Sequence, residues 1–223
     1  MKIMSYNIHS GKNTWMIPSF RKMIRFFQKE QPDVIGLQEV NENNKRGSQV
    51  TALEHQLKMN VHFGPHLSIG KGHYGIATLS RFPILDRKQI LLTSQKEQRG
   101  FLDTVIKVDR KEVHLLNTHL GLNGKERSVQ FKEIEQYIRS LSQPFIFLGD
   151  FNTISPELDS SLLIDTGKQS KKEHQSTMML TKKRIDYIFI SKELELINYE
   201  VLDVTFSDHY PVVVEVTFKR SRT

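Results

Sequence analysis

The sequence predicts a layered α/β sandwich in which two β-sheets stack face to face and helices cover their outer faces. Short segments rich in apolar and β-branched residues recur along the whole chain, so strands outnumber helices. Helical patterns are confined to the first half and the centre of the chain. Hairpin-like pairs of strands in the middle argue against an all-parallel sheet.

The composition is that of a globular protein with room for a large core. Of its 223 residues 38% are hydrophobic and 26% are charged. The absence of cysteine excludes disulfides, thiolate-bound zinc, iron–sulfur clusters and thiol catalysis. No apolar run reaches transmembrane length and no secretion signal precedes the first strand, so we expect a cytoplasmic protein. No linker or repeat marks a boundary, so we expect one domain over residues 1–223.

The first third alternates strand and helix. Residues 2–8 form a strand, and residues 18–29 form an amphipathic helix because Phe20, Ile24 and Phe27 recur at helical spacing. The same patterns then predict a strand, a helix and a short strand, at residues 34–39, 48–59 and 61–65.

After Gly70 the pattern changes to short strands separated by turn residues. These strands are expected at residues 74–80, 84–92, 102–108 and 113–117, with a hairpin tip at Arg110 and Lys111. Apolar residues at helical spacing predict a third helix over residues 126–141. Four apolar residues in a row then predict a strand at residues 145–149 that is buried on both faces.

The last third begins with little periodicity between residues 155 and 183, where we expect lysine-rich loops and a short helix at residues 156–163. Strands are predicted at residues 185–190, 197–204 and 211–218, followed by a basic tail at residues 219–223.

Many of the predicted strands end in, or are flanked by, polar residues that have no role in an apolar core. They are Asn7, Glu39, His119, Asp150, Asn152, Asp186, Asp208 and His209. Because open α/β sheets bind ligands beyond the ends of their strands, we expect these side chains to converge on one pocket. Each alone has a plainer interpretation: Asp and Asn favour turns, His119 fits a buried structural histidine, and Asp186 fits a partner for Arg184.

The residue types indicate the chemistry. Carboxylates crowded into one cleft repel one another unless a cation neutralises them, and oxygen ligands suit Mg²⁺ or Mn²⁺. Two histidines among acids suit general acid–base work. Together they predict metal-assisted attack of water on a phosphoester. The formal net charge of +7 favours a polyanionic partner.

The ordered set of motifs resembles that of the endonuclease/exonuclease/phosphatase superfamily, which includes deoxyribonuclease I-like and exonuclease III-like enzymes. The motifs are Asn7, Leu37-Gln38-Glu39-Val40, Asn117-Thr118-His119-Leu120, Gly149-Asp150-Phe151-Asn152, Arg184-Ile185-Asp186-Tyr187-Ile188-Phe189 and Ser207-Asp208-His209-Tyr210-Pro211-Val212. The resemblance implies a four-layer α/β/β/α fold and a hydrolase that uses Mg²⁺ or Mn²⁺.

The resemblance also implies roles for single residues. Glu39 resembles the principal metal ligand, and Asn7 and Asp208 line the same metal region. Asp150 resembles the residue that positions or deprotonates the attacking water, and Asn152 resembles the amide that orients water and phosphate.

The two histidines resemble residues at the scissile phosphate. His209 resembles the catalytic histidine, and Asp186 the carboxylate that hydrogen-bonds to it. His119 resembles the second histidine, which contacts a phosphate oxygen or assists the leaving group. The number of metal ions, and the choice between Asp150 and His209 as the base, stay open.

One segment departs from the family pattern. Ile76 stands where many members have an asparagine that contacts the substrate phosphate. Tyr74, Arg81 and Arg99 are the candidate phosphate contacts in its neighbourhood.

The substrate is the most open question. The net charge and the lysines between residues 168 and 183 favour nucleic acid. The Gln38-Glu39-Val40 segment is nearer to the general and sphingomyelinase-like branches, which makes a lipid or small phosphodiester the alternative. A lipid enzyme should present an exposed apolar hairpin, and the sequence singles none out. A catalytically silent binding protein on the same fold is a third hypothesis, opposed by the retention of Glu39, Asp150 and His209. No protein partner is indicated, and we expect a monomer.

Overall fold

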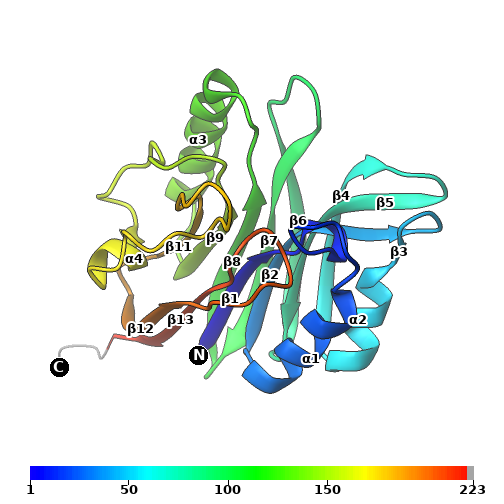
Figure 1. Cartoon of the computed structure of the whole chain (residues 1–223). Helices are drawn as coiled ribbons and strands as arrows, with labels where there is room; N and C mark the ends of the chain where they lie inside the picture. Colours follow the sequence, from blue (N-terminus) through cyan, green and yellow to red (C-terminus); the bar gives the residue numbers. More distant parts are fainter. Residues whose placement is uncertain (220–223) are drawn as a thin grey trace.

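The computed structural model describes residues 1–219 and contains two β-sheets stacked face to face (Figure 1). The first sheet has the strand order β12-β13-β1-β2-β5-β4, with β3 paired to β2, and the second has the order β10-β11-β9-β8-β7-β6. Residues 220–223 of the predicted basic tail lie outside the described residues.

The strands of the first sheet are β1 (Lys2–Asn7), β2 (Val34–Asn43), β3 (Gly47–Ser48), β4 (Asn60–Ser68), β5 (Gly72–Ser80), β12 (Leu194–Val201) and β13 (Val212–Phe218). Those of the second are β6 (Ile84–Leu92), β7 (Arg99–Val108), β8 (Lys111–His119), β9 (Phe145–Asp150), β10 (Ile164–Asp165) and β11 (Asp186–Ile190). The helices are the 3₁₀ turn η1 (His9–Gly11), α1 (Phe20–Glu30), α2 (Gln49–Leu57), α3 (Gly124–Arg139) and α4 (Thr166–Gln169).

A core of buried aliphatic side chains joins the two sheets. Ile3 and Val214 of the first sheet pack in one cluster with Leu115 and Ile146 of the second. Successive strand residues point to opposite faces, so Val213, next to Val214, packs instead in the cluster on the helical side.

Helices cover the outer face of each sheet. Apolar residues of α1 and α2 pack on the first sheet, and those of α3 pack on the second. Figure 1 shows α1 and α2 on one side of the molecule and α3 on the other. Within β9, Ile146 and Leu148 face the other sheet, whereas Phe145 and Phe147 face α3. The prediction of a strand buried on both faces is confirmed, and so is the four-layer sandwich.

The short helix expected at residues 156–163 is absent, and between β9 and β11, a stretch that the structure describes in full, the only helix is α4. Two backbone N–H groups of this segment are bound by carboxylate side chains instead. The Asp159 amide donates to the Glu135 carboxylate of α3 at 2.6 Å, and the Ser161 amide donates to Asp159 at 2.8 Å. Local Asp and Ser side chains of this kind compete with helix formation. No helix among residues 1–219 is long and apolar enough to cross a bilayer.

Asn117 forms a polar link between the two sheets inside their common core. Its amide on β8 is fully buried, accepts a hydrogen bond from Gln38 Nε2 of β2 at 2.8 Å, and donates to the Ala77 carbonyl of β5 at 2.9 Å. Buried polar groups stay compatible with an apolar core only while they are paired. These bonds therefore fix how one sheet lies on the other, directly beneath the edge where the predicted site residues gather.

Replacing Asn117 with leucine should lower the free energy of unfolding by at least about 2 kcal/mol, because it leaves Gln38 and the Ala77 carbonyl unpaired. Urea denaturation measures this loss. The double variant Gln38→Leu/Asn117→Leu should recover part of it, since it removes the stranded donor as well. A single variant as stable as the wild-type protein would contradict the assigned role.

Candidate active site

Three of the predicted residues stand in a row across the second sheet. The central strand β9 pairs in parallel with β8 and antiparallel with β11, so that Asp150 lies opposite His119 on one side and Asp186 on the other. Gly149, just before Asp150, has φ +145, and a Cβ there would meet the Thr118 carbonyl oxygen at 2.0 Å. Only glycine permits this close approach of β9 to β8.

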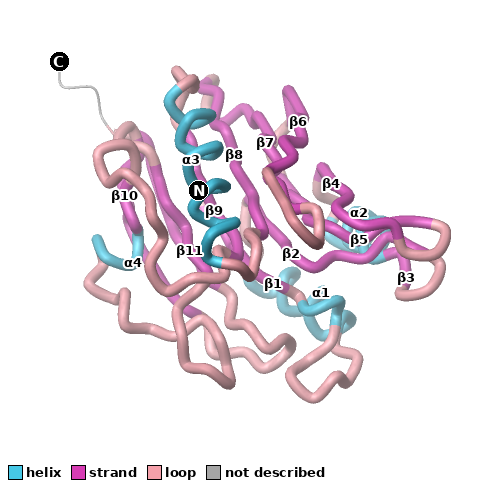
Figure 2. The backbone as a smooth tube through the Cα atoms, turned by 90° about the horizontal axis from the view of Figure 1, so that it is seen from above, coloured by secondary structure: helices cyan, strands magenta, loops and turns pink. Residues whose placement is uncertain are grey.

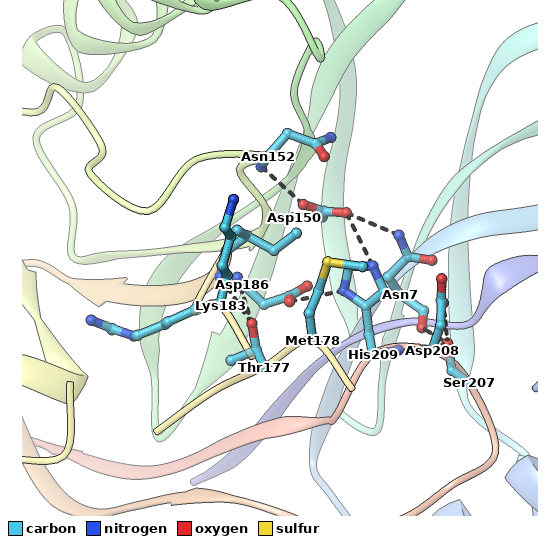
Figure 3. Close-up of polar contacts among 12 residues, drawn as sticks. Asn7, Asp150, Asn152, Thr177, Met178, Lys183, Asp186, Ser207, Asp208 and His209 are labelled. Atoms are coloured by element: carbon cyan, nitrogen blue, oxygen red, sulfur yellow. Dashed lines mark hydrogen bonds and ion pairs between the residues drawn. The ribbon is translucent and has the colours of Figure 1, made fainter. Parts of the chain in front are cut away.

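His209 joins this row from the loop before β13 of the other sheet (Figure 3). Its Nδ1 lies 2.9 Å from Asp186 Oδ2, and its Nε2 lies 3.8 Å from Asp150 Oδ2. His119 Nε2 lies 3.5 Å from the same Asp150 oxygen. One oxygen of Asp150 thus faces both imidazoles.

Asn7 and Glu39 come to Asp150 from the first sheet. Asn7 Nδ2 donates to Glu39 Oε1 at 3.1 Å and to Asp150 Oδ2 at 3.0 Å. The strand expected to end at Glu39 continues to Asn43, and its pairing with β5 shifts at this point. Glu39 has φ 62, and a bulge of this kind turns a side chain out of the regular pleat. The bulge, and not a strand end, presents Glu39 to the site.

Asp208 lies beside the same residues. Its Oδ1 is 3.4 Å from His9 Nδ1 and accepts a hydrogen bond from Ser207 Oγ at 3.2 Å. Ser207 Oγ also lies 2.7 Å from the Asn7 carbonyl oxygen, so the loop before β13 is tied to the end of β1.

Asn152 is held by two hydrogen bonds, one from its backbone and one from its side chain. Its backbone N–H donates to Asp150 Oδ1 at 2.9 Å, and its Nδ2 donates to the Leu120 carbonyl at 2.9 Å. The residue has φ 51, a left-handed conformation that asparagine tolerates better than most residues. Asn152 therefore stands rigidly at the rim above Asp150 (Figure 3).

Burial and neighbouring charges shift the pKa values of Asp150 and His209. Burial, together with the neighbouring charge of Asp186, raises the pKa of Asp150 to about 7, although His209 and Asn7 oppose the shift. Burial disfavours a charged His209, but the charge and hydrogen bond of Asp186 outweigh it and raise the pKa of His209 to about 10. His209 is thus held as an imidazolium beside a carboxyl group that titrates near neutrality.

The pKa of His119 is shifted in the opposite direction from that of His209. Its burial, and the positive charges of Arg99, His66 and His209, hold its pKa well below the usual value. Arg99 is itself buried, and its Nη1 lies 3.1 Å from Glu97 Oε1. The site therefore combines one charged histidine with one neutral histidine.

The donor set fits a hard divalent cation. Asp150, Asp186 and His209 bring polar atoms within 4.8 Å of one another. Because His209 is held as an imidazolium, the oxygens of the two carboxylates are the atoms of this group that could bind a cation. Within the described residues, buried Asp186 Oδ1 has no hydrogen-bond partner. The Glu39 carboxylate adds further oxygen ligands next to Asp150, across the Asn7 amide. Clustered carboxylates with an unpaired oxygen are stabilised by a bound cation.

The three predicted phosphate contacts are not all at this site. Arg99 lies close enough to shift His119, and burial and the charge of Glu39 raise the pKa of the Tyr74 hydroxyl. The prediction for Arg81 is wrong. Because β5 runs antiparallel to β2, residue 81 follows the opposite end, where its N–H donates to the Asp33 carbonyl at 2.9 Å. Ile76 is fully buried and offers no polar contact.

The sequence did not single out Thr177 or Met178 in the segment expected to be a solvated loop. Thr177 Oγ1 accepts hydrogen bonds from the Ile185 and Asp186 amides at 3.0 and 3.1 Å, and Met178 pairs with His209 in an isolated bridge. They position the start of β11 and the loop before β13. No periodicity or motif marks them, since their partners lie elsewhere in the sequence.

Three curated proteins resemble the chain over most of its length. "Uncharacterized protein YbhP" of Escherichia coli is 26% identical over 183 residues, covering 74% of this chain and 72% of that protein. Exodeoxyribonuclease III of Haemophilus influenzae is 25% identical over 185 residues, covering 77% and 63%. Phospholipase C of Staphylococcus aureus is 24% identical over 192 residues, covering 62% and 58%.

Solved structures share the fold. An endonuclease/exonuclease/phosphatase family protein from Leptotrichia buccalis superposes with a TM-score of 0.80 at 23% identity, covering 98% of this chain and 100% of that one.

A sequence model of the Endonuclease/Exonuclease/phosphatase family matches residues 4–209. The match runs from β1, just before Asn7, to His209 and so contains every residue of the cluster described above. The chain belongs to the endonuclease/exonuclease/phosphatase family, whose members are phosphoester hydrolases.

Proposed function

We propose that the chain forms one catalytic domain and is a divalent-metal-dependent phosphodiester hydrolase that works by in-line attack of water. The observation that carries the proposal is the environment of Asp150. Its buried carboxylate lies between a charged imidazole, a neutral imidazole and the Asn7 amide, 3.0 to 3.8 Å from one oxygen. One charged partner is enough to stabilise a buried carboxylate with a purely structural role, so the second, neutral histidine indicates a chemical role.

Glu39, Asn7 and Asp208 are the residues proposed to hold the metal, Mg²⁺ or Mn²⁺. The bulge in β2 and the tie from Ser207 to β1 bring their side chains to one side of Asp150. A bound divalent cation would neutralise the crowded carboxylates and polarise the phosphate oxygens.

Asp150 is proposed to position the attacking water and accept its proton, because its pKa of about 7 suits a base at neutral pH. Asn152, fixed by the Leu120 carbonyl, would orient the water and the phosphate. As the water oxygen bonds to phosphorus, the bond from phosphorus to the leaving oxygen breaks on the opposite side.

The histidines are proposed to act on the phosphate. His209, kept as an imidazolium by Asp186, would stabilise the negative charge that develops on the phosphoryl oxygens. His119 would contact a phosphate oxygen or assist the leaving group.

The proposed substrate class rests on the net charge of the chain and on its relatives. The net charge of +7 favours a polyanion such as nucleic acid. The likeness to a protein named phospholipase C keeps a lipid or small phosphodiester as the second candidate. A metal-supplemented hydrolysis screen over plasmid DNA, abasic duplex DNA, RNA, sphingomyelin, inositol phosphates and bis-p-nitrophenyl phosphate separates these candidates. We propose a monomer that acts in the cytoplasm.

Asp150→Ala and His209→Ala should each lower turnover of bis-p-nitrophenyl phosphate by at least about 100-fold, because each removes a proton-transfer or charge-stabilising group. Steady-state kinetics measure the loss, and circular dichroism verifies the fold. His55→Ala, on the exposed face of α2, is the matched control and should keep full activity. Wild-type turnover in either site variant would contradict the proposed mechanism, whereas no turnover in the wild-type protein would favour a silent binding protein.

Excess EDTA should abolish hydrolysis, and added Mg²⁺ or Mn²⁺ should restore it, because the carboxylate cluster needs a cation to bind an anionic substrate. Titration calorimetry should show weaker Mg²⁺ binding by Glu39→Gln. Activity unchanged by EDTA, together with unchanged metal binding by this variant, would refute the proposed metal site.

Asp186→Asn should lower the pKa of His209 below about 10, since it removes the negative charge that favours the imidazolium. NMR titration of the imidazole resonances in EDTA measures this shift without turnover. Despite burial, which lowers it, the pKa of His114 is raised by Asp103 and not by Asp186, so His114 is the internal reference. A His209 pKa that does not move would show that Asp186 does not control its charge.

A further inference from the structure

Exposed apolar side chains gather around the active-site edge of the molecule. Of the eleven large apolar residues exposed within residues 1–219, six lie in loops that leave this edge. They are Trp15, Met16, Ile17, Leu122, Ile154 and Leu180. Exposed apolar residues scattered singly need no explanation, but a group around one feature marks an interaction surface.

Trp15, Met16 and Ile17 lie on a hairpin that is closed at its base. Lys12 bridges to Pro18 across its base, and Asn13 Oδ1 accepts hydrogen bonds from the Trp15 and Ile17 amides at 3.0 and 2.9 Å. Trp15, Met16 and Ile17 remain 74%, 56% and 58% exposed. The backbone is thus built to hold these side chains in solvent. We call residues 12–18 the apolar hairpin.

The apolar hairpin is attached to Met179 and to the loop before β13. Thr14 Oγ1 lies 3.1 Å from Met179 Sδ and donates to the Ser207 carbonyl at 3.4 Å. The Met179 amide in turn donates to the Asp208 carbonyl at 2.9 Å. Leu180, the next residue, is 66% exposed. Figure 2, which looks onto this edge, shows the loop before α1 projecting beyond the sheets.

The charged side chains of the apolar hairpin and of the loop that carries Leu180 are all positive. Residues 12–18 carry Lys12, residues 176–183 carry Lys182 and Lys183, and neither segment contains a carboxylate. Both Lys182 and Lys183 are exposed. The rim therefore pairs apolar side chains with cations, which matches the interface of an anionic bilayer.

We propose that the apolar hairpin and the Leu180 loop dock on an anionic lipid surface and set the active-site edge against the headgroups. Tryptophan prefers the boundary between headgroups and acyl chains, and Met, Ile and Leu gain by leaving water there. The choice of a bilayer over a nucleic acid rests on these aliphatic residues. Base stacking needs aromatic faces, and the two loops hold only one aromatic ring.

Docking goes beyond the proposed hydrolase activity and is tested without it. Trp15 is the only tryptophan, so intrinsic fluorescence reports on the hairpin alone. In EDTA, vesicles of equimolar phosphatidylcholine and phosphatidylglycerol should shift its emission to the blue, and brominated lipids in the same vesicles should quench it. Vesicles of phosphatidylcholine alone should bind more weakly.

Vesicle co-sedimentation compares variants. Trp15→Ala and Ile17→Ala should each weaken binding by about tenfold, the loss expected for one apolar side chain that no longer leaves water. Lys182→Gln/Lys183→Gln should weaken it roughly fivefold per lysine. Ile197→Ala is the matched control, because Ile197 on β12 is 60% exposed and lies outside these loops. It should bind like the wild-type protein.

Four outcomes would overturn the proposal. The first is an emission that vesicles leave unchanged. The second is a blue shift that follows protein concentration alone, which indicates self-association through the hairpin. The third is a shift caused by a single-stranded oligonucleotide but not by vesicles, which indicates stacking. The fourth is an equal loss of binding in Ile17→Ala and Ile197→Ala. None of them depends on whether the phosphodiesterase activity is found.

Discussion

The buried carboxylate of Asp150 is the constraint around which the molecule is arranged. It is 2% exposed and lies where the two sheets meet, so its charge must be balanced by groups brought from both. Asn7 reaches it from the first sheet, His119 from the neighbouring strand, and His209 from the loop before β13. The same three side chains that stabilise the buried carboxylate of Asp150 are those proposed to act on a phosphoester.

The stacking of the sheets makes this balance possible. Asn117 binds groups of β2 and β5 from β8, and Gly149 lets β9 approach β8 closely enough for Asp150 to lie beside His119. Small changes in this stacking would break the hydrogen bonds among Asn7, Asp150, Asp186 and His209. The stability of the inner layers and the geometry of the site therefore depend on the same contacts.

The edge that carries the site has a buried polar centre and an outer rim that is apolar and basic. The centre is charged and rigid, with Asp186, His209 and Asn152 each held by hydrogen bonds. The rim exposes Trp15, a cost that a purely structural loop would not carry. A surface of this kind is what the proposed docking on an anionic lipid surface requires.

The sequence by itself determined nearly all the strands and helices and the residue types of the site, because periodicity and motif order are local properties. Tertiary pairing decided the rest. The direction of β5 removed Arg81 from the site, a bulge rather than a strand end presented Glu39, and side-chain bonds replaced the helix expected at residues 156–163. The attachment of the apolar hairpin to Ser207 and the bridge from Met178 to His209 also depend on partners far away in the chain. Which edge a residue reaches, and what faces it there, is set by non-local packing that no local pattern encodes.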